Sequence, residues 1–219
     1  MTNYLFDIYL TLPEIYLIFS IFILLIFGVL NEGSQYLGYP LLIKPSGLLS
    51  LQILIFTWFF IFKLPCSNFI IWNFFLVSSF SSTVLKLALL KISIIWISFT
   101  LTYLSNEKIN AFEYWILSLL TILALNLLVQ VFDILIMYLI IELQSLSFYI
   151  LASFKRSSEF STEAGLKYFV LGAFSSAFLL FGFSLIYGTT GLTNFLDFNI
   201  LFSGFLVENS LLLFSTFQV

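Results

Sequence analysis

The stretch that decides the fold is Phe132–Phe154, FDILIMYLIIELQSLSFYILASF, which is apolar apart from a few isolated polar side chains. A membrane-spanning helix needs about 20 mostly apolar residues, because the hydrocarbon core of a bilayer is roughly 30 Å thick. The stretch meets that requirement, and the polar run KRSSE at 155–159 ends it. It therefore predicts a transmembrane helix.

Comparable apolar stretches lie on both sides of this one. The segment Asn68–Val77 is apolar but too short to span, so we expect an interfacial or re-entrant piece there. The final stretch, 199–219, predicts a short or partial seventh span. The remaining predicted spans are 9–30, 47–62, 83–104, 112–129 and 164–187.

The composition points to the same class of protein. Of 219 residues, 61% are apolar and only 9% are charged, and the mean hydropathy is +1.12, whereas soluble domains carry about 25% charged residues. The net charge of −3 is spread along the chain, which argues against nucleic acid as a partner. We expect an all-α membrane protein of about six transmembrane helices plus a partial seventh, forming a single transmembrane helical domain over residues 1–219 in the lipid bilayer.

The residue types also limit the chemistry. A single cysteine, Cys66, excludes a disulfide framework within the chain and a multi-cysteine metal site. The absence of histidine excludes His-ligated haem or zinc and His-based acid–base catalysis. We therefore expect no metal-binding or cofactor-binding residues in this chain, although structural phospholipids are expected around it. The N-terminus shows no basic region typical of a cleavable targeting segment.

The basic residues predict the orientation of the helices. If the N-terminus faces outward, the loops that carry Lys44, Lys108 and Lys155-Arg156 all fall on the inner side, and Lys63 falls outside. Because inner loops of membrane proteins carry an excess of Lys and Arg, this orientation is favoured.

Charged residues inside predicted spans are the candidates for function, because each costs about 2.5–3.5 kcal/mol on insertion scales. Glu142 lies near the middle of the span at 132–154 and is either a proton-relay or ion-path group or a helix-packing hydrogen-bond partner. Asp133, at the start of that span, is expected to cap the helix.

Lysines supply the other candidates. Lys167, near the start of the span at 164–187, either extends to the interface or pairs with a carboxylate; Glu163 is four residues before it on the same helix face. Lys86 is expected to reach an interface, and Lys91, deeper in the same span, needs a polar partner.

The small residues of Gly172–Ala177 are expected to allow close helix packing.

The run IELQSLSFYILASFKRSSEFSTEAGLKYFVLGAFSSAFLLFGFSLIYGTTG, residues 141–191, closely resembles the chain 2 family of mitochondrial NADH–ubiquinone oxidoreductase (respiratory complex I). Members are antiporter-like subunits of the membrane arm. The resemblance implies an antiporter-like 14-helix fold containing two inverted repeats. It also implies that Glu142 is the family's key glutamate of the fifth helix, which pairs with a lysine of the seventh helix, and that Lys167 matches a lysine at the start of the sixth.

The sequence departs from the family in several respects, and the lysines of the family's eighth and twelfth helices are missing. The seventh-helix lysine normally precedes a Pro-Phe-His-x-Trp motif, which a chain without histidine cannot contain. The expectation is an N-terminal portion of a split subunit, completed by a second chain.

The resemblance implies a membrane-arm subunit of complex I in the mitochondrial inner membrane, a part of NADH:ubiquinone reductase that contributes to proton translocation. Other membrane-arm subunits would be its partners. No redox chemistry is expected in this chain, since flavin, iron–sulfur clusters and quinone would belong to other subunits. Two alternatives stay open, a non-pumping structural subunit of the same arm and a stand-alone monovalent cation–proton antiporter component.

Overall fold

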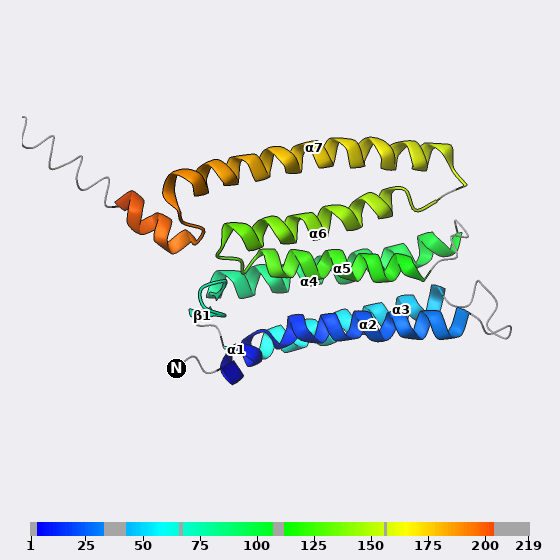
Figure 1. The fold of residues 1–219 in the computed structure, drawn as a ribbon. Helices are drawn as coiled ribbons and strands as arrows, with labels where there is room; N and C mark the ends of the chain where they lie inside the picture. The colour runs from blue at the N-terminus through cyan, green and yellow to red at the C-terminus, as the bar shows by residue number, and fades with distance from the viewer. Residues whose placement is uncertain (1–3, 33–42, 66–67, 107–111, 156, 204–219) are drawn as a thin grey trace, which may run out of the picture.

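The structure, a computed structural model, describes residues 4–32, 43–65, 68–106, 112–155 and 157–203. In these ranges the chain is almost entirely helical, with one small β-hairpin (Figure 1). Residues 195–203 are also helical. The elements in chain order are α1 (Tyr4–Leu10), α2 (Leu12–Glu32), α3 (Ile43–Lys63), β1 (Phe69–Ile71), β2 (Leu76–Ser78), α4 (Phe80–Asn106), α5 (Glu113–Leu128), α6 (Ile134–Ala152) and α7 (Glu159–Thr190).

The six helices α2 to α7 fall on the six predicted spans. Five of them, α2, α3, α4, α6 and α7, are long and apolar enough to cross a membrane, and α5 is a shorter apolar helix. The expectation of an all-α, multi-pass membrane protein is therefore confirmed. The predicted partial seventh span at 199–219 begins inside the helical segment 195–203, and the rest of it lies outside the described residues.

Helix α7 is longer than its predicted span, which began at residue 164. It has 32 residues and starts at Glu159, after Ser158 in an extended conformation. Its length of about 48 Å exceeds the roughly 30 Å of a hydrocarbon core, so at least one end extends beyond the apolar layer. The polar first turn hid this part of the helix from a prediction based on hydropathy.

The helices lie side by side, and their connections alternate between the two ends of the bundle (Figure 1). One end holds α1 and the β-hairpin, and we call it the hairpin end. The opposite end holds the starts of α3 and α7, with Lys44 and Lys155 close by, and we call it the basic end. Lys63 closes α3 at the hairpin end, as the predicted alternation requires. Lys108 and Arg156 lie outside the described residues.

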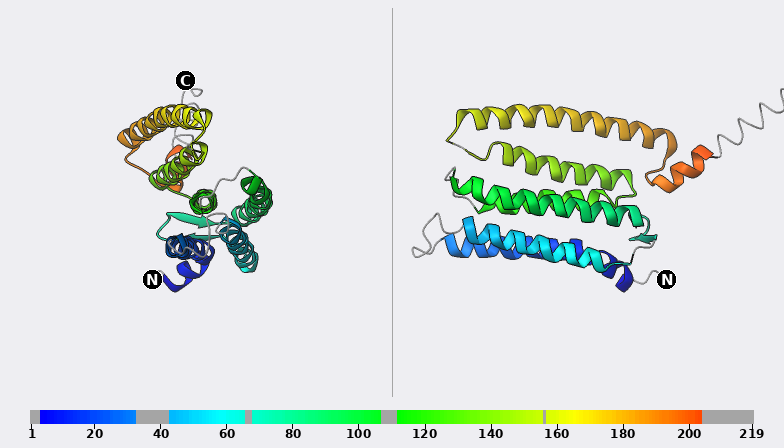
Figure 2. Two further views of the ribbon diagram at one scale, coloured as in Figure 1. Left: turned by 90° about the vertical axis from the view of Figure 1, so that its right-hand side faces the viewer. Right: turned by 180° about the vertical axis from the view of Figure 1, so that it is seen from behind.

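Helix α5 is the centre of the bundle. It packs against α2, α3 and α4 on one side and against α6 on the other, and α7 packs on α6 (Figure 2). Its Trp115 and Leu119 are fully buried, together with Leu54 of α3 and Leu90 of α4. Because neighbouring helices rather than lipid surround α5, it needs less length than the outer spans.

The predicted short piece at 68–77 is a two-stranded antiparallel hairpin, which pairs Phe69 with Ser78. Its backbone also bonds to the connection between α5 and α6, where the Val77 amide donates to the Gln130 carbonyl at 2.8 Å. The predicted interfacial or re-entrant piece is thus a hairpin, and its position at the end of the helices favours the interfacial alternative. The exposed Trp72 is the kind of side chain found at a membrane interface.

Candidate functional site

The first predicted site residue, Glu142, lies on α6, eight residues after its first residue, Ile134. That separation is about 12 Å along the axis, close to the middle of the helix. The helix is a candidate membrane span, so Glu142 lies at membrane depth. A carboxylate in this position must find a polar partner, a water molecule or a proton.

The carboxylate of Glu142 is only partly satisfied. The Ser145 hydroxyl donates to Glu142 Oε2 at 3.4 Å, while it also bonds to the Glu142 carbonyl at 3.0 Å. Tyr138, one turn earlier, interacts with the same carboxylate. Glu142 Oε1 is buried and has no hydrogen-bond partner among the described residues, and no lysine in those ranges pairs with it. This free oxygen can accept a proton or a hydrogen bond.

Lys167, the second predicted site residue, lies near the start of α7. Its ammonium forms an ion pair with Glu163 one turn earlier, and both side chains are exposed. The structure therefore realises the predicted pair on one helix face. It does not bring Lys167 to Glu142, and the family role of Lys167 stays a prediction.

Asp133 is the N-cap of α6, as predicted. Its Oδ1 accepts from the amides of Leu135 at 2.9 Å and Ile136 at 3.5 Å, and its Oδ2 accepts from the Thr193 hydroxyl at 2.7 Å. Both carboxylate oxygens are thus engaged. Asp133 has a structural role that joins the start of α6 to the segment after α7.

Reasoning from the sequence did not identify the most buried ion pair among the described residues. Lys86 of α4 forms an ion pair with Glu14 of α2, and the two side chains are 1% and 4% exposed. The prediction that Lys86 reaches an interface is wrong, because its side chain turns inward. The sequence does not mark Glu14 as a candidate functional residue, because a carboxylate in the first turn of a helix ordinarily complements the helix dipole.

Lys91 lies one and a half turns further along α4 and is exposed on the bundle surface. The polar partner predicted for it is absent from the described part of the chain. A lysine at this depth therefore faces either lipid or a group outside the described residues.

The small residues of α7 bring it close to α6, as predicted. A Cβ on Gly172 would lie 1.9 Å from the Tyr149 hydroxyl oxygen, and one on Gly165 would lie 2.4 Å from the Ser153 Cβ. The exposed Ser175 and the half-buried Ser176 bond to the backbone of their own helix. Gly172 and Gly165 are thus the residues of α7 that permit the close approach.

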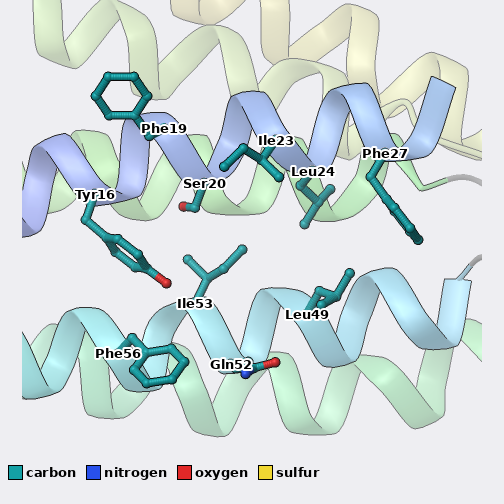
Figure 3. A pocket seen from close by; sticks show the side chains of 10 residues that line it. All are labelled: Tyr16, Phe19, Ser20, Ile23, Leu24, Phe27, Leu49, Gln52, Ile53 and Phe56. Carbon is teal, nitrogen blue, oxygen red and sulfur yellow. The ribbon is translucent and has the colours of Figure 1, made fainter. Parts of the chain in front are cut away.

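A pocket of about 490 Å³ lies between α2 and α3 (Figure 3). Its walls are mostly apolar, and Tyr16, Ser20 and Gln52 add three polar groups. None of the predicted site residues lines it. In the ranges that the structure describes, no group of three or more His, Cys, Asp or Glu side chains is placed to hold a metal ion.

Two curated relatives of this chain carry related names. The chain is 42% identical over 207 residues to the NADH-ubiquinone oxidoreductase chain 2 of Marchantia polymorpha, an alignment that covers 88% of this chain and 40% of the relative. It is 37% identical to the NADH-quinone oxidoreductase subunit N of Pelagibacter ubique, over 84% of this chain and 38% of the relative. The chain thus spans about two fifths of the length of the curated relatives it matches.

A family model and a solved structure agree with these relatives. The model described as NADH:quinone oxidoreductase/Mrp antiporter, transmembrane, matches residues 132–219, a range that includes both Glu142 and Lys167. A chain of the respiratory complex I from Thermus thermophilus superimposes with a TM-score of 0.60 at 26% identity, covering 80% of this chain and 38% of the other.

Proposed function

Since this chain belongs to the family of NADH–ubiquinone oxidoreductase chain 2 and its bacterial counterpart, subunit N, we propose that it is a membrane-arm subunit of respiratory complex I that carries protons. The observation that carries the proposal is Glu142. It is a carboxylate near the middle of a membrane helix, with one buried oxygen that has no partner among the described residues. The family model matches the same helix.

The chemistry of this chain is proton transfer alone. Oxidation of NADH and reduction of ubiquinone belong to other subunits, and flavin and iron–sulfur clusters with them. Glu142 takes up a proton on Oε1, which has no partner among the described residues, while Ser145 and Tyr138 interact with the same carboxylate. Loss of the proton restores the carboxylate, which then needs a positive partner, because an unpaired charge is costly at this depth. The family resemblance gives that role to a lysine of the seventh helix.

The proposed setting is the mitochondrial inner membrane, with the basic end toward the matrix. Other membrane-arm subunits and the remainder of the antiporter-like fold, carried by a second chain, would pack against this one. Large apolar side chains are exposed along α7, and Lys91 is exposed on α4, so both surfaces are open to such partners.

A native gel stained for NADH dehydrogenase activity, with mass spectrometry of the active band, tests this setting. Absence of the chain from that band would contradict it.

We also propose that a phospholipid acyl chain fills the pocket between α2 and α3, because the pocket is apolar and lies between two candidate membrane spans. Ile53→Trp would fill the space with an indole. Native mass spectrometry of the gently solubilised complex should then show loss of bound phospholipid, whereas Ile55→Trp, on the exposed side of α3, should not. Equal lipid content in both variants would contradict the proposal.

The central test of function is Glu142→Gln, which keeps the shape of the side chain and removes its proton-carrying group. We expect normal assembly and a proton-transfer step slowed about 10²-fold or more, the usual contribution of a general acid–base group. The rate of NADH-driven proton uptake by sealed inner-membrane vesicles measures the slowed step, and proton uptake per electron shows whether the variant is uncoupled.

The matched control is Asp133→Asn, a carboxylate-to-amide change at the start of the same helix. Asn caps helices about as well as Asp, so pumping should not change. If Glu142→Gln pumps like the wild type at full turnover, this chain is a structural subunit of the arm. Sodium transport by the chain alone would instead support the antiporter alternative.

A further inference from the structure

The ion pair between Glu14 and Lys86 is the most deeply buried charged group that the proposed function does not use. Glu14 is the third residue of α2, and Lys86 is the seventh residue of α4. Both helices start at the hairpin end. The Lys86 ammonium contacts Glu14 Oε1, and the general tilt of helical side chains toward the start of their own helix favours a contact with a residue nearer the hairpin end.

The pair is incompletely satisfied. Glu14 Oε1 accepts from Lys86, but Glu14 Oε2 is buried and has no hydrogen-bond partner in the part of the chain that the structure describes. A buried pair balances its desolvation only if the remaining lone pairs also find donors. Glu14 Oε2 therefore requires a proton or a buried water molecule.

Two more acceptors of this kind lie at the same end. Asn126 Oδ1, in the last turn of α5, and Gln130 Oε1, just after that helix, are buried without donors among the described residues. Helix α5 packs against both α2 and α4, the helices of the ion pair. Three buried acceptors thus lie on packed elements toward the same end of the bundle, where ordered water can satisfy them. The other charged side chains at this end of the described chain are Asp7, Lys63, Asp133 and Asp197.

Holding α2 and α4 together does not by itself explain why this position carries a buried ion pair. Apolar side chains of similar volume often hold helices as well as a buried ion pair or better. Such a replacement would also remove the need for a donor to Glu14 Oε2. The surrounding core of Leu17, Leu54 and Leu90 shows that apolar packing is available in these helices.

We propose that Glu14 and Lys86 form a second proton-exchange site, on the side of α5 away from α6, fed by water from the hairpin end. The inference rests on the proposed function, because it gives this chain a second group on a proton route. A hydronium ion in that water gives a proton to Glu14 Oε2: one of its O–H bonds breaks as the carboxyl O–H bond forms, and a water molecule is left. The neutral carboxyl releases the Lys86 ammonium, whose charge the same water must then solvate. Transfer of the carboxyl proton back to a water molecule breaks the carboxyl O–H bond, forms hydronium and restores the ion pair.

The test uses the whole complex in sealed inner-membrane vesicles, with the variants Glu14→Gln, Lys86→Met and the double variant. Asp133→Asn is the matched control, since it lies at the same end and both of its oxygens are already engaged. We expect Glu14→Gln to assemble normally and to lower proton uptake per electron severalfold. The double variant should recover any assembly lost by Lys86→Met and should still pump poorly.

A second measurement does not depend on turnover. Infrared difference spectra between two pH values should contain a protonated-carboxyl band that disappears in Glu14→Gln and persists in Asp133→Asn. Unchanged pumping and an unchanged spectrum in Glu14→Gln would overturn the proposal, as would a double variant that regains both assembly and pumping. If Glu142→Gln lowers pumping in the same vesicles and Glu14→Gln does not, only this inference fails. If neither variant changes pumping, the proposed function fails too.

Discussion

Three carboxylates of this chain show how differently one chemical group behaves in a membrane bundle. Asp133 accepts from two backbone amides and a hydroxyl, so both of its oxygens are satisfied. Glu14 engages one oxygen with Lys86, and Glu142 is contacted by the Ser145 hydroxyl and by Tyr138; each keeps one buried oxygen without a partner among the described residues. A satisfied carboxylate holds a structure together, whereas a buried free oxygen is a place where a proton can bind. Glu14 and Glu142 are therefore the two residues to mutate first.

The carboxylate that pairs with each lysine also explains the environment of that lysine. Lys86 is buried because Glu14 compensates its charge, and Lys167 is exposed beside Glu163, where the pair adds little to stability. Sequence reasoning could predict the Asp133 cap and the pairing of Glu163 with Lys167, because each depends only on neighbours within one or two helix turns. The roles of Glu142 and Lys167 in proton transfer stay predictions. Sequence reasoning missed the pair of Glu14 and Lys86, because 72 residues separate the two positions and only the packing of α2, α4 and α5 brings them together.

Of the two glycines that let α7 approach α6, Gly172 has the closer contact. Because a Cβ on Gly172 would collide with the Tyr149 ring, Gly172→Leu should push the helices apart and destabilise the chain by about 1–3 kcal/mol, the usual cost of overpacking. The unfolding temperature of the solubilised complex and its yield on a native gel measure the effect.

The chain offers a matched control for this change on the same helix. Gly182 of α7 has nothing within 4 Å of its Cβ position, so Gly182→Leu should be neutral or slightly stabilising. Combining Gly172→Leu with Tyr149→Ala should recover part of the loss, because it vacates the space that the leucine enters. Equal losses from Gly172→Leu and Gly182→Leu would show that helix contact is not the cause.

Among the elements, hydropathy was enough to place α2 to α7, because each helix is a long apolar segment between polar breaks. The β-hairpin could not be predicted in this way. Its strands have three residues each, and its turn holds Trp72, Asn73 and Phe74 at φ of 52°, 53° and 70°. Side chains larger than Gly rarely adopt that region. The Asn194 amide, which donates to the Phe74 carbonyl at 3.0 Å, supports the turn from a segment 120 residues away.

At the scale of the whole molecule, the two ends of the bundle differ in chemistry. The basic end carries Lys44 and Lys155, while the hairpin end carries Lys63, exposed aromatic side chains and the Glu14–Lys86 pair. Basic residues concentrate on the inner side of a membrane. The proposed orientation therefore puts the basic end in the matrix and gives the second proton-exchange site access to water on the opposite side of the membrane.

This orientation can be tested with single cysteines in a Cys66→Ser background. Ser157, between α6 and α7, and Asn68, before β1, are both exposed and lie at opposite ends of the bundle. A membrane-impermeant maleimide should label Asn68→Cys in mitochondria stripped of their outer membrane, and it should label Ser157→Cys in inverted inner-membrane vesicles. Each variant should be labelled at least about tenfold more in that preparation than in the other, because a charged reagent does not cross the hydrocarbon core. The reverse pattern would place the N-terminal side of α2 in the matrix. The Glu14–Lys86 pair would then lie on the matrix side of the membrane, and protons would reach it from there.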